Sequence, residues 1–252
     1  MKPSGITLLD SAHGTRLIAR GLDIRIDDPA LWVISHPEEI RNLHRADLMA
    51  GAESIMTCTF GANRHWLERY PSSDANEINR RAVDIARDCI REIGSKASIA
   101  GCVGPVALNS EIAFREQVDA LAEAGASRIV VETIGFDQVP RLCQLLPASR
   151  EIAVFVSLWN WGTHPAESAR RLADHGVAGW GINCMSDANS ITEVLAALRE
   201  PALPATFLKS SIHEIEPFVR FAKRSIDFGI DSIGGCCGTD HRHIAALRIA
   251  LS

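Results

Sequence analysis

Residues 165–183, PAESARRLADHGVAGWGIN, contain the pattern that decides the fold class. Residues 165–175 have helical periodicity after a proline that is tolerated in a first turn, and Gly176 follows where the helix is expected to end. Residues 179–183 then form a short run that reads as buried, which is typical of a parallel strand covered by helices. The stretch therefore predicts a helix, a glycine cap and a strand, which together form one αβ unit.

The same pattern, a glycine followed closely by a strand, recurs along the chain. Gly51-Ala52, Gly125-Ala126 and Gly229-Ile230 also lead within a few residues into a buried-looking run. Eight such runs are predicted as strands, at residues 6–10, 54–59, 97–101, 128–132, 152–158, 179–183, 205–208 and 231–233. Amphipathic helices are expected between them, at residues 37–50, 76–93, 111–124, 165–175, 189–199 and 241–251.

Eight βα units in about 250 residues match the usual size of a (β/α)8 barrel. A doubly wound sheet generally has fewer strands and carries a glycine-rich phosphate loop after the first. The chain has no Pro/Ser/Gly-rich linker and no charge block that would separate domains. We therefore predict an α/β fold, a (β/α)8 TIM barrel, formed as a single domain over residues 1–252.

The composition and charge of the chain indicate which classes of binding partner to expect. The chain is 46% hydrophobic with a formal net charge of −5 and no basic block, so no nucleic acid and no membrane surface is expected as a partner. Charged residues interrupt every apolar run, and residues 1–10 lack a signal-peptide pattern. Seven cysteines, an odd number, favour a reducing compartment. We expect a soluble, cytoplasmic protein that acts on small molecules.

The active site of such a barrel lies at the carboxyl ends of its strands. The residues at the predicted strand ends are Asp10, Thr57, Cys58, Thr59, Cys102, Glu132, Thr133, Asn183, Cys184, Lys209, Cys236 and Cys237. Cys184 follows the sixth strand and the cysteine pair follows the eighth, on the same side of a closed barrel. We therefore expect their three sulfurs to converge.

Three thiolates around one vacant position describe a catalytic zinc site, and the vacant position implies a substrate ligand. Consecutive strand residues point to opposite faces, so Gly234, Gly235 and Gly238 are expected to supply the positive φ angles that let Cys236 and Cys237 meet. A strained vicinal disulfide or redox pair is the main alternative for these two residues. Three thiolates make zinc a weak activator of water and suit it to a soft sulfur ligand, so the expected substrate is a thiol.

These motifs resemble those of the zinc-dependent homocysteine S-methyltransferase family over nearly the whole chain. The resemblance is carried by Leu8-Leu9-Asp10 with Gly14-Thr15, by Gly51-Ala52 with residues 57–63, by Gly104-Pro105, by Glu132-Thr133-Ile134, by residues 181–184 and by residues 233–239. It implies a barrel in which Cys184, Cys236 and Cys237 bind Zn²⁺ and the sulfur of homocysteine completes the coordination.

The resemblance also implies how substrates bind. The acids matching Asp10 and Glu132 hold the ammonium group of homocysteine, and backbone amides after the first strand hold its carboxylate. Thr59 and Asn183, within the same motifs, are assigned to substrate binding as well. Family members that use methylcobalamin or methylfolate carry further domains, so a small sulfonium donor, S-methylmethionine or S-adenosylmethionine, is expected, with methionine as product.

Two departures from the family pattern keep other functions open. Residues 10–14 read Asp-Ser-Ala-His-Gly, with His13 where the family has a less polar residue, and Lys209 stands in a loop region where the family commonly has proline, asparagine and glycine. Lys209 is a candidate contact for a substrate carboxylate. A methyltransferase for another thiol or selenol and a non-catalytic thiol-binding component of a methyl-transfer assembly remain alternatives. The sequence does not indicate an oligomeric state.

Overall fold

The computed structural model describes residues 5–146, 152–199, 202–203 and 205–252, and its centre is a sheet of eight parallel strands. The strands follow one another in the order β1-β8-β7-β6-β5-β4-β3-β2. Their bounds are Thr7–Leu8 (β1), Ser54–Met56 (β2), Ser98–Val103 (β3), Arg128–Gly135 (β4), Val154–Asn160 (β5), Gly179–Asn183 (β6), Phe207–Ser210 (β7) and Ser232–Gly235 (β8). The predicted (β/α)8 barrel is confirmed.

A short seam between β1 and β2 closes the barrel. Leu9 pairs with Ser54 through a single parallel bridge. Beside it, the Glu53 backbone N–H donates to the Leu8 carbonyl at 2.7 Å, and the Glu53 carboxylate accepts the Leu8 N–H at 2.9 Å. A side chain thus supplies a hydrogen bond at a seam where β1 is only two residues long.

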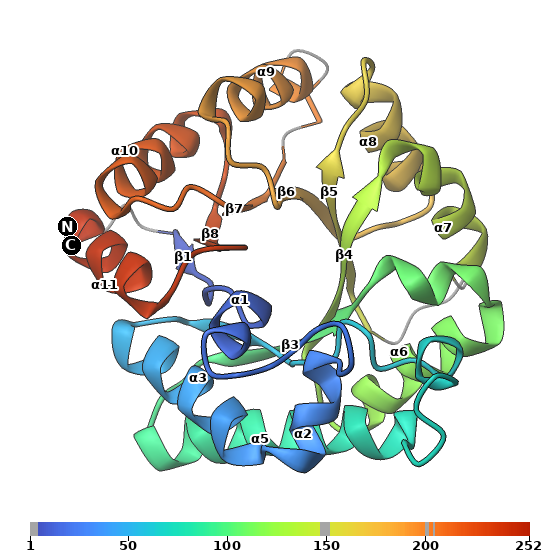
Figure 1. The fold of residues 1–252 in the computed structure, drawn as a ribbon. Coiled ribbons are helices and arrows are strands. Elements are labelled where there is room, and N and C mark those ends of the chain that lie inside the picture. Colours follow the sequence, from blue (N-terminus) through green and yellow to red (C-terminus); the bar gives the residue numbers. More distant parts are fainter. Residues whose placement is uncertain (1–4, 147–151, 200–201, 204) are drawn as a thin grey trace.

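Helices form a ring around the strands, as the view along the barrel shows (Figure 1). The longer ones are Pro37–Ala50 (α3), Ala75–Ile93 (α5), Glu111–Glu123 (α6), Val139–Leu145 (α7), Pro165–Asp174 (α8), Ala188–Arg199 (α9), Ile215–Ser225 (α10) and His241–Leu251 (α11). The ring closes where α11 packs against α3. No helix among the described residues has the length and apolarity needed to cross a membrane.

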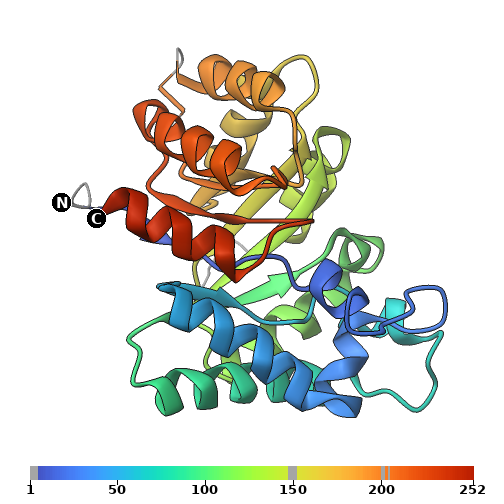
Figure 2. The same cartoon turned by 60° about the vertical axis from the view of Figure 1, so that its left-hand side comes forward.

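Short helices lie where the chain leaves the first two strands. They are Gly14–Ile18 (α1), Trp32–Ser35 (α2) and Arg64–Leu67 (α4), with a 3₁₀ turn at Pro29–Leu31 between the first two. Further 3₁₀ turns follow β3 at Pro105–Asn109, β4 at Phe136–Gln138 and α10 at Ile226–Phe228. Helix α1 lies near the barrel axis rather than in the outer ring (Figure 1). In the rotated view the segment from α1 to α2 projects beyond one end of the barrel (Figure 2).

Local signals explain most element boundaries. The predicted bounds of α3, α11 and β6 match those observed. The glycines predicted to follow helices, Gly51, Gly125, Gly176 and Gly229, all have positive φ, a conformation that costs glycine little because it lacks a Cβ. Helices α7 and α10 were not among the predicted helices, although the buried residues of α10, Phe218, Phe221, Ala222 and Ser225, have helical spacing.

The predicted seventh strand, residues 205–208, begins and ends two residues too early. In β7 Phe207 and Lys209 alternate with Leu208, so both belong to the inward-facing set. A small apolar cluster lies in the barrel interior, made of Met56, Ala100, Cys102, Val130 and Phe207 with Leu9 and Phe155 packed against it. Lys209 is therefore a buried charged residue beside an apolar interior.

Candidate metal and substrate site

A cavity of about 340 Å³ opens at the carboxyl ends of the strands. Of the predicted site residues, it is lined by Thr59, Glu132, Cys184, Cys236 and Cys237. Further lining residues come from the loop before α1 and from α1 itself, from the 3₁₀ turn at Pro29–Leu31, from strands β2, β3, β4, β7 and β8, and from the segment after β2. Asp10 and Asn183 do not line the cavity, and both are fully buried behind it.

Three cysteines from two distant parts of the chain meet on this wall. The Cys184 sulfur lies 2.9 Å from that of Cys236 and 3.7 Å from that of Cys237. All three sulfurs lie within 4.8 Å of one another, and all three cysteines are free thiols. This is the one group of three or more histidine, cysteine or acidic side chains in the described part of the chain that is close enough to share a metal ion.

The chain turns immediately after Cys236, and this turn brings the adjacent cysteines together. The Cys236 N–H donates to the Ser210 carbonyl at 2.9 Å, which continues the pairing of β8 with β7. The Cys236 carbonyl then accepts both the backbone N–H of Thr239 at 3.1 Å and its hydroxyl at 2.7 Å. One sulfur thus follows the strand while the next lies in the turn.

The glycines around the pair have a different role from the one predicted. Only Gly238 has a positive φ, at 80°. Gly234 and Gly235 are needed for close approach instead, since a Cβ on Gly234 would lie 2.6 Å from the Asp10 carbonyl oxygen and one on Gly235 would lie 2.1 Å from the Thr239 hydroxyl. The expectation that all three supply positive φ angles was wrong at two positions.

Cys184 adopts a left-handed backbone conformation, with φ of 58°. This conformation is unusual for a residue with a side chain and tends to occur at functional sites. The preceding Asn183 donates from its side-chain nitrogen to the Thr133 hydroxyl at 2.8 Å and approaches the Cys184 sulfur at 3.6 Å. Asn183 thereby links the ends of β4 and β6 behind the thiol.

The three thiols change one another's pKa values. The neighbouring Cys236 and Cys237 raise the pKa of Cys184 well above its ordinary value, because their hydrogen bonding favours its protonated form. The same contacts lower the pKa of Cys237 to about 3. One sulfur in the group is therefore ready to be a thiolate, and a cation placed among the three would favour ionisation of the others.

An ion cluster lies beneath the cysteines. The Lys209 ammonium donates to Asp10 Oδ1 at 2.8 Å, while Asp10 Oδ2 accepts the Met56 N–H at 2.8 Å and lies 3.1 Å from His13 Nε2. Burial alone would raise the pKa of Asp10, but Lys209 and His13 hold it well below its usual range. Both oxygens of Asp10 are thus occupied by groups of the chain itself.

Glu132 faces the cavity from β4, three residues before the strand ends at Gly135. Its Oε2 accepts the Cys102 thiol at 3.5 Å, and its Oε1 lies 3.9 Å from the Lys209 ammonium but accepts no hydrogen bond within the described chain. Burial raises the pKa of Glu132, an effect that Lys209 only partly offsets. Glu132 is therefore the acid of the cluster with an oxygen still free to bind a ligand.

Thr59 takes part in a closed hydrogen-bond network with its neighbours. Its hydroxyl donates to the Cys102 carbonyl at 2.7 Å, so the 2.7 Å contact between Thr57 and Thr59 must be donated by Thr57. Thr57 in turn accepts the Cys102 N–H at 3.0 Å. The network joins the ends of β2 and β3 and holds this wall of the cavity rigid.

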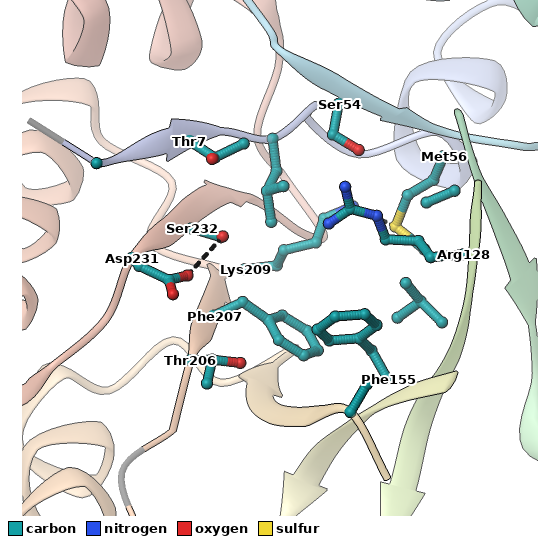
Figure 3. A pocket seen from close by; sticks show the side chains of 15 residues that line it. Thr7, Ser54, Met56, Arg128, Phe155, Thr206, Phe207, Lys209, Asp231 and Ser232 are labelled. Atoms are coloured by element: carbon teal, nitrogen blue, oxygen red, sulfur yellow. Dashed lines mark hydrogen bonds between the residues drawn. The ribbon is translucent and has the colours of Figure 1, made fainter. Parts of the chain in front are cut away.

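A second cavity, of about 400 Å³, enters the barrel from the opposite end. It is lined by the inward side chains of the strand beginnings, among them Thr7, Ser54, Arg128 and Phe155 (Figure 3). Lys209 and Met56 belong to the walls of both cavities. The Lys209 ammonium also donates to the Met56 sulfur at 3.0 Å, and this pair forms the partition between the two ends.

Sequence reasoning did not select Met56 or Asp28 as site residues. Met56 ends β2, and strand alternation from Ser54 places it on the inward face, so the signal was present. Asp28 precedes a 3₁₀ turn rather than a strand end; its two oxygens accept the Ala30 N–H at 2.8 Å and the Trp66 indole N–H at 2.7 Å. Within the described residues Asp28 forms no ion pair, so its charge on the cavity wall has no protein counter-ion.

Comparison with known proteins identifies a family and its relatives. A sequence model of the family described as homocysteine S-methyltransferase matches residues 7–251. Betaine–homocysteine S-methyltransferase 1 of Xenopus laevis is 26% identical in an alignment 269 positions long, which covers 87% of this chain and 66% of that relative. Methionine synthase of Mycobacterium tuberculosis is 27% identical in an alignment 292 positions long, which covers 96% of this chain and 24% of that relative. This chain thus spans just under two thirds of the betaine relative.

Similar solved structures match a larger share of both chains. The metallated form of the homocysteine methyltransferase MmuM from Escherichia coli superposes with a TM-score of 0.80 at 26% identity, covering 98% of this chain and 96% of that one. Its oxidized form has a TM-score of 0.83 at 25% identity, with the same coverage. The similarity therefore includes the ends of the strands where the cavity lies.

Proposed function

The chain belongs to the homocysteine S-methyltransferase family, as its motifs indicated, and on that premise we propose that it is a zinc-dependent enzyme that methylates a thiol. The observation that carries the proposal is the convergence of Cys184, Cys236 and Cys237 on the wall of a cavity at the catalytic end of the barrel. A cytoplasmic, reducing setting is part of the proposal, because the site needs all three cysteines as thiols.

The donor set fits zinc. Zn–S bonds of about 2.3 Å in a tetrahedral site separate the sulfurs by about 3.8 Å. The Cys184–Cys237 distance of 3.7 Å matches this value, and Cys184 and Cys236, at 2.9 Å, are too far apart for a disulfide and close enough to part by a small side-chain rotation. When bound, zinc would lower the pKa of a substrate thiol that binds beside the three cysteines. One solved neighbour, MmuM of Escherichia coli, is in a metallated form and is 26% identical in sequence.

The chain's own residues prepare this site. Asn183, held by Thr133, would orient the Cys184 sulfur and donate to it, as groups behind a metal ligand commonly do. The Thr57–Thr59–Cys102 network would keep the opposite wall in place, so that Thr59 acts on substrate binding through shape. Positioning of the two reactants is the main contribution that such a rigid cavity makes to the rate.

The methyl donor is proposed to be a small cation. In the transfer, a thiolate attacks the methyl carbon, the bond from that carbon to the donor breaks, and its electron pair stays with the leaving atom, which loses its positive charge. No proton moves at carbon. Asp28 on the cavity wall would attract a positively charged donor, and a sulfonium such as S-methylmethionine or S-adenosylmethionine meets this requirement. Betaine, named in the animal relatives, is a second cation to test.

Homocysteine is the acceptor that the family implies, with methionine as its product. Glu132 is the residue best placed to meet its ammonium group, because one of its oxygens is free. A different thiol is the second candidate, and the Lys209–Asp10 contact at 2.8 Å favours it. A non-catalytic thiol-binding component is the remaining alternative.

The test uses purified protein, first for its metal content and then with zinc, a panel of thiols and donors carrying a deuterated methyl group. Transfer of the label to a thiol, detected by mass spectrometry, is the expected result. Thiol binding without transfer from any sulfonium or betaine donor would reject the enzyme and favour the binding component.

A further inference from the structure

A lysine of the chain occupies the centre of the acidic subsite below the cysteines. The Lys209 ammonium lies 2.8 Å from Asp10 Oδ1 and 3.9 Å from Glu132 Oε1. Its side chain is 6% exposed and that of Asp10 is 0% exposed. A buried carboxylate requires a nearby cation, and here the protein itself provides one.

The position of Lys209 is built into the barrel. It lies on the inward face of β7, where its backbone pairs with Asn183 on one side and with Gly234 on the other. Its side chain crosses from the wall of the lower cavity, next to Phe207, towards Met56 (Figure 3). Displacing the ammonium from Asp10 would strand a buried charge at each end of the broken contact.

Each carboxyl group of the cluster already lies beside a basic group of the chain. Asp10 and Glu132 contribute two carboxyl groups, and Lys209 and His13 contribute two basic groups. A substrate ammonium placed on the free oxygen of Glu132 would lie beside the ammonium of Lys209. Two ammonium groups on either side of the same carboxylate repel strongly in a buried site. The subsite therefore disfavours a second cation beside Lys209.

We propose that Lys209 occupies the place of a substrate ammonium, and that the acceptor is a thiol without an α-ammonium group. This inference rests on the proposed function, since it names the class of thiol that the same site takes. Asp28, the other acid of the cavity wall, already accepts two N–H groups and is assigned above to the cationic donor. Lys209 is thus the residue that determines acceptor specificity.

The test compares homocysteine with 4-mercaptobutyrate, which has the same thiol and carboxylate but hydrogen in place of the ammonium. Dissociation constants are measured by calorimetry on zinc-loaded protein without donor. We expect the wild type to bind 4-mercaptobutyrate at least about tenfold more tightly than homocysteine. Lys209→Met should reverse this preference, because Asp10 and Glu132 then lack the cation that the lysine supplied. The matched control Lys223→Met, on the exposed face of α10, keeps the wild-type ratio.

A reversal of selectivity distinguishes a role in specificity from a structural role. Structural damage would weaken the binding of both thiols together. Lys209→Gln, which keeps a neutral donor for Asp10, serves if the methionine variant does not fold, and it should also gain affinity for homocysteine relative to 4-mercaptobutyrate. A wild type that binds homocysteine as tightly as its analogue, or variants that leave the ratio unchanged, would overturn the inference. If the binding ratios hold but neither thiol is methylated by any cationic donor, the proposed function fails and the inference about Lys209 stands.

Discussion

The sulfur of Cys184 lies 2.9 Å from the sulfur of Cys236, although the residues are 52 positions apart in the chain. They follow β6 and β8, and β7 runs between these strands with hydrogen bonds to both. Lys209, on β7, reaches the ion cluster from between them. The register of three adjacent strands therefore sets both the metal-binding group and the charge beneath it.

Replacing either adjacent cysteine should remove the metal while leaving the barrel intact. Cys236→Ser and Cys237→Ser each delete one sulfur of a three-sulfur set, and the barrel core consists of apolar residues that do not depend on the metal. Zinc content by atomic emission should fall from one equivalent to traces together with methyl transfer, with an unchanged circular dichroism spectrum. Cys89→Ser, in the buried face of α5, is the control and should keep its zinc. Stoichiometric zinc in either serine variant would contradict the assignment.

Asn183→Ala should weaken zinc binding without removing a ligand. The substitution deletes the side-chain nitrogen that lies 3.6 Å from the Cys184 sulfur and 2.8 Å from the Thr133 hydroxyl. Loss of such an outer contact commonly lowers metal affinity by about 10–100-fold, which competition with a chromophoric chelator would measure. Asn189→Ala, at the exposed start of α9, is the matched control. Equal zinc affinity in the two variants would show that Asn183 has no influence on the site.

Much of the barrel could be predicted because its signals are local. Buried-looking runs, glycine caps and helical periodicity lie within one αβ unit, and α3, β6 and α11 were predicted with their observed bounds. The strand ends then indicated which residues share one end of the barrel. The placement of Cys184 and the cysteine pair at the same end of the barrel follows from that order, because parallel strands bring their carboxyl ends together.

What the sequence did not reveal depends on distant contacts. Lys209 and Asp10 are 199 residues apart, and a lysine followed by two serines is typical of a loop rather than of a buried strand. The roles of Gly234 and Gly235 likewise depend on Asp10 and Thr239, which pack against them from elsewhere. The left-handed conformation of Cys184 has no local signal, since a cysteine has no preference for it.

The loop before α1 should depend on one buried ion pair. Arg16 lies 2.7 Å from Asp47 on α3, with 10% and 0% of the side chains exposed, and Ser11 donates to the same carboxylate at 2.7 Å. Arg16→Ala leaves the Asp47 charge buried, so the free energy of unfolding should fall by about 3–5 kcal/mol. Arg20→Ala breaks a more exposed pair with Glu39 and should cost less than about 1 kcal/mol. Urea unfolding of both variants measures the difference, and similar losses would contradict this reading.

The His13–Asp10 contact should make the protein less stable at alkaline pH. Burial lowers the pKa of His13, but its interactions with Asp10 and, next, with Cys58 outweigh burial and raise the pKa from 6.5 to about 10. Below pH 6.5 the imidazole is protonated in both the folded and the unfolded chain, so the full stabilisation is present. Above that pH the unfolded chain loses its proton first, so stability falls as pH rises towards about 10.

His13→Gln tests this pH dependence, because glutamine cannot titrate. The free energy of unfolding of zinc-free protein, measured with urea across this pH range, should fall more steeply with pH in the wild type than in His13→Gln. Titrations of groups that do not interact with His13 are common to both proteins and cancel in the difference. His65→Gln, at a partly exposed position beside Glu68, should keep the wild-type slope. Parallel pH profiles for wild type and His13→Gln would show that His13 is not held as a cation by Asp10, and that the ion cluster has one positive charge fewer than the geometry implies.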